Sequence, residues 1–124
     1  PWQYVLEPIS GYILLAEKLT NNISTYSGGW NFGPKSSDFW PVSAVIKFLA
    51  KKEDKLKWHF NEKVEFHEAR ILKLDSTKAR EELNWKSKWN VEKALLKTLQ
   101  WHEAFEKEYD MKKFSLKQIE DYLD

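Results

Sequence analysis

The sequence predicts one domain of the mixed α/β (α+β) class, mostly helical with a few short strands. Apolar residues recur at helical spacing in several segments, whereas a few shorter segments are extended or alternating in character. A length of 124 residues, with 42% hydrophobic and 31% charged residues, is typical of one globular domain with a modest core. Because the predicted strands are too few for a complete sheet, we expect a lobe that packs against another structure.

The first helix is expected from Pro8, because proline suits the first turn of a helix. Residues 2–6 before it are extended in character. Asn21 and Asn22 are plausible stop residues. The apolar face of this helix follows helical spacing through Ile9, Tyr12, Ile13, Ala16 and Leu19.

A short strand and a second helix are expected next. Gly28 and Gly29 mark a turn, so we predict a strand over residues 30–32 that Gly33-Pro34 closes. Pro41 then opens a helix, by the same argument as Pro8. The apolar face of this second helix consists of Val42, Val45, Ile46 and Leu49.

Two more extended segments follow. Residues 55–60 alternate between lysine or histidine and apolar side chains, which is typical of a strand with one buried face. Residues 70–74 are interpreted as another short extended piece that ends at Asp75.

Capping residues mark the remaining helices. Asp75 or Ser76 can cap a helix over residues 77–83, because their side-chain oxygens accept free amide hydrogens there, and Asn84 is a fair left-handed end to it. Asn90 is expected to cap the last long helix, and a short helix is expected over residues 115–123. The apolar face of the long helix includes Val91, Leu95, Thr98, Leu99, His102 and Phe105.

Composition excludes several classes of function. Twenty basic and nineteen acidic residues are interspersed, so we expect no nucleic-acid partner. The absence of cysteine removes disulfides and thiol catalysis. No apolar run approaches the ~20 residues that span a bilayer, and the first residues carry no signal-peptide pattern. We therefore expect no membrane partner and a cytoplasmic location.

Common catalytic motifs are missing as well. The sequence has no G-x-G-x-x-G, no P-loop, no H-E-x-x-H and no G-x-S-x-G. The three histidines are too scattered to suggest a metal site. Tyr109 and Lys113 have the Y-x-x-x-K spacing of a proton-transfer pair. We reject this pair, because about one such match is expected by chance and no glycine-rich dinucleotide loop precedes it.

Several ordered blocks carry a specific resemblance. Residues 2–12 resemble W-Q-x-V-L-E-P-x-x-G-Y, residues 30–34 read W-N-F-G-P, and residues 67–83 resemble H-E-A-x-x-L-K-L-D-x-x-K-A-R-x-x-L. These blocks are similar to CDP-glucose 4,6-dehydratases, which are extended short-chain dehydrogenase/reductases. Asn84 and Ser87 depart from the Gly and Pro usual in that turn. Further residues in the family register are Trp85, Trp89, Glu92, Ala94, Leu95, Thr98 and Trp101.

The resemblance implies a fold and a role. Residues 1–105 would be the C-terminal nucleotide-sugar-binding lobe, and residues 106–124 a helical tail that the family pattern leaves unmatched. The Rossmann half, with NAD and the catalytic Tyr-Lys pair, would lie outside this chain. The chain alone is therefore expected to hold no cofactor and to be inactive. The parent enzyme would convert CDP-glucose to CDP-4-dehydro-6-deoxyglucose and is expected to be a homo-oligomer.

Five residues are implied as substrate-binding. Trp2 and Gln3 match the stretch that follows the substrate-clamping arginine of the family, and His67, Glu68 and Arg70 match the block that approaches the nucleotide. A guanidinium at position 70 can pair with the diphosphate, and a carboxylate at position 68 can accept from ribose or base. The alternatives are structural, namely internal ion pairs for Arg70 and Glu68, a structural hydrogen bond for His67 and a core position for Trp2.

Rival interpretations remain open from the sequence. Another extended family member, such as a dTDP-glucose or GDP-mannose dehydratase or a sugar epimerase, would share the architecture. A stand-alone carbohydrate- or protein-binding module would also suit the seven tryptophans. The tryptophans discriminate, because a binding module needs them exposed in one patch, whereas we expect Trp85, Trp89 and Trp101 in the core and Trp30 mostly so.

Overall fold

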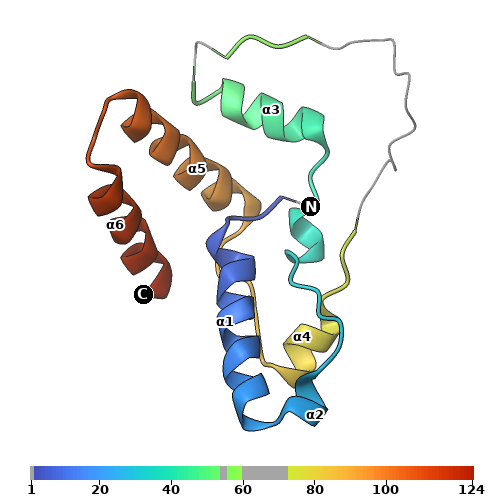
Figure 1. The fold of residues 1–124 in the computed structure, drawn as a ribbon. Helices are drawn as coiled ribbons and strands as arrows, with labels where there is room; N and C mark the ends of the chain where they lie inside the picture. Colours follow the sequence, from blue (N-terminus) through green and yellow to red (C-terminus); the bar gives the residue numbers. More distant parts are fainter. Residues whose placement is uncertain (1, 54–55, 60–72) are drawn as a thin grey trace.

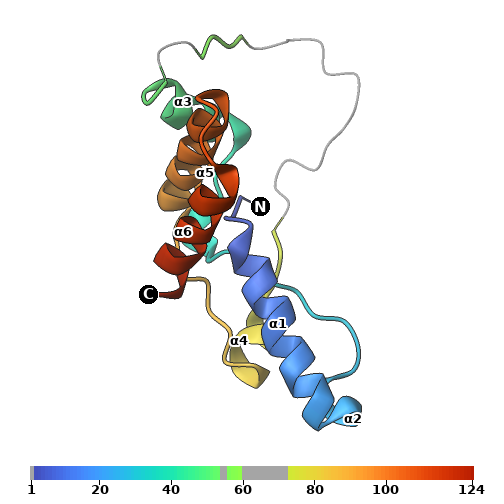
Figure 2. The ribbon, with the colours of Figure 1, turned by 60° about the vertical axis from the view of Figure 1, so that its left-hand side comes forward.

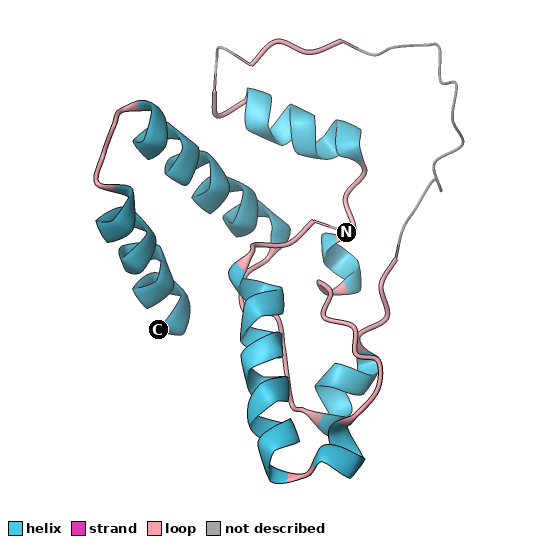
Figure 3. Cartoon of the chain, in the orientation of Figure 1, coloured by secondary structure: helices cyan, strands magenta, loops and turns pink. Residues whose placement is uncertain are grey.

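The computed structural model describes residues 2–53, 56–59 and 73–124, which form helices joined by loops (Figures 1 and 3). The helices are α1 (Leu6–Asn21), α2 (Ile23–Tyr26), a 3-10 turn η1 (Ser36–Asp38), α3 (Val42–Ala50), α4 (Thr77–Glu82), α5 (Val91–Glu106) and α6 (Met111–Leu123). In both ribbon views α2 and α4 lie beside the far end of α1, whereas α5 and α6 lie near its start (Figures 1 and 2).

The predicted strands are the main correction. Residues 30–32 form a loop, and so do residues 56–59 and 73–74, the described parts of the other two extended segments. A strand needs a neighbouring strand for its backbone groups, and the described residues supply none. Other partners take those groups in part, since the Gly33 amide donates to the Ser76 hydroxyl at 2.7 Å. The mostly helical part of the fold prediction is confirmed.

Helix α1 is held at both ends by the residues that the sequence indicated. It begins at Leu6, so Pro8 falls in the first turn, where no backbone N–H is needed. It ends at Asn21, and the side chain of Asn22 accepts from the Thr25 amide at 3.1 Å. The same asparagine therefore ends α1 and caps α2.

Aromatic side chains make two core clusters. One consists of Tyr4, Trp89, Ala94 and Tyr122, and the other of Phe32, Ala79, Leu83 and Trp85. The Phe32 and Trp85 rings meet edge to face, with centroids 5.2 Å apart, a preferred arrangement for aromatic pairs. The core positions predicted for Trp85 and Trp89 are confirmed.

Trp101 is not a core residue, contrary to the prediction. It is 38% exposed and stacks in parallel on the Phe105 ring at 5.8 Å. Its indole N–H donates to the Ser115 hydroxyl at 3.1 Å, which links α5 to α6. Helix α6 therefore covers only part of the Trp101 ring.

The turn after α4 and the start of α5 follow their predicted caps. Asn84 adopts φ 55°, the left-handed conformation expected of it. The Trp85 amide then donates to the Ala79 carbonyl at 3.1 Å, which closes the end of α4. The Asn90 side chain accepts from the Lys93 amide at 2.9 Å and caps α5.

Helix α6 begins earlier than the sequence indicated. It starts at Met111 rather than at Ser115, because the Asp110 carboxylate accepts from the Lys113 amide at 3.1 Å and provides a better cap. Helix α5 runs through residue 105 to Glu106. The division of the chain at residue 105 stays a prediction.

At Gly11, α1 packs so closely against the Phe32 ring that there is no room for a side chain. An added Cβ would lie far inside van der Waals contact with the Phe32 ring. We expect Gly11→Ala to lower the free energy of unfolding by about 1–3 kcal/mol, because overpacking outweighs the better helix propensity of alanine. Urea denaturation followed by circular dichroism measures this. Gly29→Ala is the matched control, since nothing lies within 4 Å of its added Cβ; equal stabilities of the two variants would contradict the prediction.

Candidate functional site

The N-terminal segment carries the two predicted site residues that the structure describes. The Trp2 indole N–H donates to the Trp40 carbonyl at 3.1 Å. The Gln3 side-chain amide donates to the Phe32 carbonyl at 2.9 Å. Both donors therefore bind backbone in the loop before α3. The segment at Trp2 and Gln3 is therefore held against this loop by two hydrogen bonds.

These two hydrogen bonds do not involve the face of the Trp2 ring or the side-chain oxygen of Gln3. Trp2 is 39% exposed, so a core position for it is excluded. Gln3 Oε1 is buried and has no hydrogen-bond partner among the described residues. An unsatisfied buried acceptor costs about 1–3 kcal/mol. Gln3 therefore presents a buried acceptor that none of the described residues satisfies.

His67, Glu68 and Arg70 lie outside the described residues. The structure therefore does not place them relative to Trp2 and Gln3. Lys73, the first residue described after them, follows Arg70 by three positions in the sequence.

A buried carboxylate positions the N-terminal segment. Glu7 is 0% exposed. Its Oε1 accepts from the Trp89 amide at 2.8 Å, and its Oε2 accepts from the Lys88 amide at 3.0 Å. The Tyr122 hydroxyl also donates to Oε2, at 2.9 Å. These charge-assisted bonds offset the cost of taking a carboxylate out of water.

The network around Glu7 extends to both core clusters. The Ser10 hydroxyl lies 3.2 Å from the Tyr122 hydroxyl and accepts from the Trp85 indole at 3.0 Å. Burial raises the pKa of Tyr122 to about 12; the hydrogen bond to Ser10 opposes this, and the bond to the Glu7 carboxylate adds to it. The Tyr122 hydroxyl therefore stays protonated as a donor.

Sequence reasoning missed Glu7. The residue stands in the first turn of α1, where an acidic side chain ordinarily faces solvent and favours the helix N-terminus. The one available signal was its place inside the W-Q-x-V-L-E-P block. Its donors are more than eighty residues away, so local spacing could not find them.

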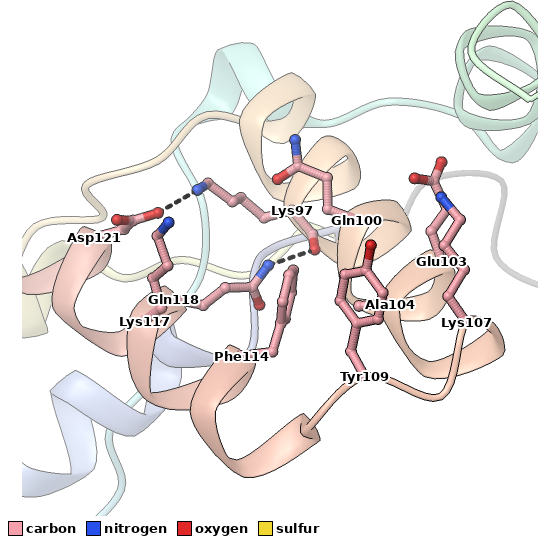
Figure 4. Close-up of a pocket in the computed structure, with 10 residues that line it drawn as sticks. All are labelled: Lys97, Gln100, Glu103, Ala104, Lys107, Tyr109, Phe114, Lys117, Gln118 and Asp121. Atoms are coloured by element: carbon pink, nitrogen blue, oxygen red, sulfur yellow. Dashed lines mark hydrogen bonds and ion pairs between the residues drawn. The ribbon is translucent and has the colours of Figure 1, made fainter.

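A cavity of about 310 Å³ lies between α5 and α6 (Figure 4). At one end Lys97 donates to the Asp121 carboxylate at 2.6 Å, and Gln118 donates to the Lys97 carbonyl at 2.9 Å. This hydrogen bond from Lys97 lowers the pKa of Asp121 despite some desolvation. The residues that line this cavity are Lys97, Gln100, Glu103, Ala104, Lys107, Tyr109, Phe114, Lys117, Gln118 and Asp121.

This cavity does not assemble a reactive pair. Tyr109 lines it, but the Lys113 ammonium lies 3.6 Å from the Asp110 carboxylate. Tyr109 and Lys113 both line a separate pocket at the start of α6, so the rejection of the Y-x-x-x-K pair stays a prediction from the sequence.

Neither a metal-binding cluster nor a membrane-spanning helix occurs among the described residues. They contain no group of three or more His, Asp or Glu side chains that could hold a metal ion. None of their helices is long and apolar enough to cross a membrane.

Comparison with known proteins decides the relationship. No family profile matches the chain. A CDP-glucose 4,6-dehydratase of Salmonella typhimurium is 38% identical to it over 124 residues, which is 99% of this chain. The chain is related to CDP-glucose 4,6-dehydratases. It spans 34% of the length of that enzyme and matches its C-terminal part.

The dehydratase relationship confirms the resemblance of the sequence blocks. Because the alignment leaves out only 1% of the chain, it also runs through most of residues 106–124. Within the dehydratase-related chain, the W-Q-x-V-L-E-P block forms the start of α1 and its buried anchor. The W-N-F-G-P block forms the loop that receives Gln3.

Burial of tryptophan bears on the rival binding module. Trp85 and Trp89 are 4% and 7% exposed, and Trp30 and Trp40 are half-buried. Trp30 also donates to the Tyr26 carbonyl at 2.8 Å. Aromatic composition therefore reflects core packing in large part, and it no longer argues for a ligand platform by itself.

Replacing the buried carboxylate tests its structural weight. In Glu7→Gln an amide NH2 replaces an oxygen that accepts from backbone N–H or the Tyr122 hydroxyl, so one donor faces another. We expect a loss of about 2–4 kcal/mol in the free energy of unfolding, measured by urea denaturation. Glu17→Gln, on the exposed face of α1, should change it by less than about 0.5 kcal/mol. Equal, small effects would contradict the anchoring role.

Alkaline pH should weaken the fold through Tyr122. Its pKa is raised to about 12 in the folded chain, whereas an unfolded tyrosine titrates near ~10. The stabilisation is complete below pH ~10 and is lost as pH rises through about 12, because only the unfolded state releases the proton at first. Chemical denaturation between pH 8 and 11.5 measures the decline. Tyr122→Phe should be less stable at pH 8 but show a shallower decline; parallel curves would contradict the assignment.

Proposed function

We propose that this chain is the nucleotide-sugar-binding part of an NAD-dependent CDP-glucose 4,6-dehydratase. The observation that carries the proposal is the 38% identity to such an enzyme along 99% of the chain. The proposed substrate is CDP-glucose and the product CDP-4-dehydro-6-deoxyglucose. We place the enzyme in the cytoplasm and expect a homo-oligomer of the whole protein.

The proposed binding residues divide into two groups. Trp2 and Gln3 hold the segment beside the substrate, and the exposed ring of Trp2 offers a face on which a sugar or base can stack. His67, Glu68 and Arg70 form the block that approaches the nucleotide, with Arg70 for the diphosphate and Glu68 for ribose or base. Hydrogen bonds to the Trp40 and Phe32 carbonyls support the first assignment, because they fix the segment before any ligand arrives.

The cofactor belongs to another part of the enzyme in this proposal. NAD would take the hydride from C4 of the glucose unit and return it to C6 after water is eliminated across C5–C6. The residues of this chain do not fit NAD, since the sequence has no G-x-G-x-x-G loop for its pyrophosphate. We derive no catalytic step for this chain and propose that it is inactive alone.

Calorimetric titration with CDP, dTDP and GDP tests the proposal. We expect weak, selective binding of CDP, with a Kd on the order of 1 mM for an isolated lobe. His67→Ala, Glu68→Ala and Arg70→Ala should each weaken CDP binding, whereas His102→Ala should not.

His102 is the matched control because it is exposed on α5 and lies 3.4 Å from Glu106. Preference for dTDP or GDP would overturn the substrate named here. No binding to any nucleotide would show that the site needs the remaining part of the enzyme.

A further inference from the structure

Helix α1 exposes a continuous apolar stripe. The stripe consists of Val5, Ile9, Tyr12, Ile13 and Ala16, which recur every three or four positions and therefore lie on one side of the helix. Val5 precedes the first residue of α1 but has helical dihedral angles (φ −58°, ψ −30°), so it continues the stripe. All five residues are exposed, and Ile13 is 58% exposed.

The other sides of α1 already pack inside the described chain. Glu7 and Gly11 are buried. Leu14 and Leu15 pack against the second core cluster, which contains Phe32. Helix α1 is therefore apolar both on its packed sides and on its exposed side. A helix that is hydrophobic all round is ordinarily buried, so the stripe lacks a neighbour that would cover it.

The stripe carries no charge. The charged residues of α1 are Glu7, Glu17 and Lys18, and none of them belongs to the stripe. Depletion of charged side chains is typical of the covered centre of an interface, whereas surfaces that stay in water are mixed in charge. The stripe therefore has the character of an interface rather than of a solvent-exposed helix face.

The size of the stripe argues against a second copy of the chain as its cover. Residues 5–16 of a helix are roughly 18 Å long and about 10 Å wide. The resulting footprint of roughly 200 Å² is well below the ~800 Å² per partner that a stable dimer buries. A part of the same polypeptide can pack on a smaller area, because the covalent linkage gives it a high effective concentration.

The related dehydratase contains such a part. Its alignment with this chain covers 34% of its own length, which leaves 66% of that enzyme (100% less 34%) outside the alignment. The match lies in its C-terminal part, so the unaligned part comes before it.

We propose that the stripe from Val5 to Ala16 is the face on which the preceding part of the same enzyme packs, through an uncharged apolar surface of its own. This inference rests on the proposed function for the existence of that part. It concerns neither the nucleotide nor the five residues assigned to it.

Cysteine labelling tests the contact, since the chain has no cysteine of its own. In the 124-residue chain, a maleimide should label Ile13→Cys and Ala16→Cys rapidly, because both positions are exposed. In the whole enzyme we expect labelling at both positions to be at least about tenfold slower, because a covered thiol does not reach the reagent. Peptide mass spectrometry assigns the label to each position.

Leu116→Cys is the matched control, because Leu116 is 50% exposed on α6 and lies outside the stripe. Its labelling rate should differ by less than about twofold between the chain and the whole enzyme. Unchanged rates at Ile13→Cys and Ala16→Cys, or equal protection at Leu116→Cys, would overturn the proposal.

Light scattering of the 124-residue chain distinguishes a second copy from the rest of the enzyme. We expect a monomer at micromolar concentration, with a labelling rate at Ile13→Cys that does not depend on protein concentration. A dimer that protects this position would assign the stripe to self-association and overturn the proposal. Neither measurement involves a nucleotide, so an unprotected stripe leaves the CDP titration as a separate test of the proposed function.

Discussion

The carboxylate of Glu7 is the interaction on which the rest of the structure depends. It joins the first turn of α1, the segment at Lys88 and Trp89, and the end of α6 through three hydrogen bonds. Lys88 reinforces the same junction, since its ammonium donates to the Tyr122 and Leu123 carbonyls at 2.8 and 2.9 Å. A carboxylate taken out of water is stable only with such a full set of donors. The charge therefore dictates one arrangement of the three parts and penalises others.

This constraint reaches the proposed binding residues. With α1 fixed at its start, the short segment before it must pass along the loop that precedes α3. Trp2 and Gln3 then bind carbonyls of that loop. The position of the Trp2 ring therefore depends on Glu7, a buried carboxylate that is not among the proposed binding residues.

The sequence predicts well what depends on neighbouring residues. Pro8, Asn22 and Asn90 marked helix ends correctly, because caps act within three or four residues. Alternation at residues 56–59 failed, since a strand also needs a partner that no local pattern supplies. Glu7 was missed for the same reason, because its partners come from distant segments. Family resemblance indicated His67, Glu68 and Arg70, which local spacing alone could not.

The sequence separation within the Glu7 network has a consequence for how the chain is made. The hydrogen bond from Tyr122 to Glu7 joins two residues that are 115 positions apart in the sequence. During synthesis, Glu7 leaves the ribosome long before this partner exists, so its carboxylate must stay hydrated. Helix α1 can form early, but its docking has to wait until α6 has been synthesised.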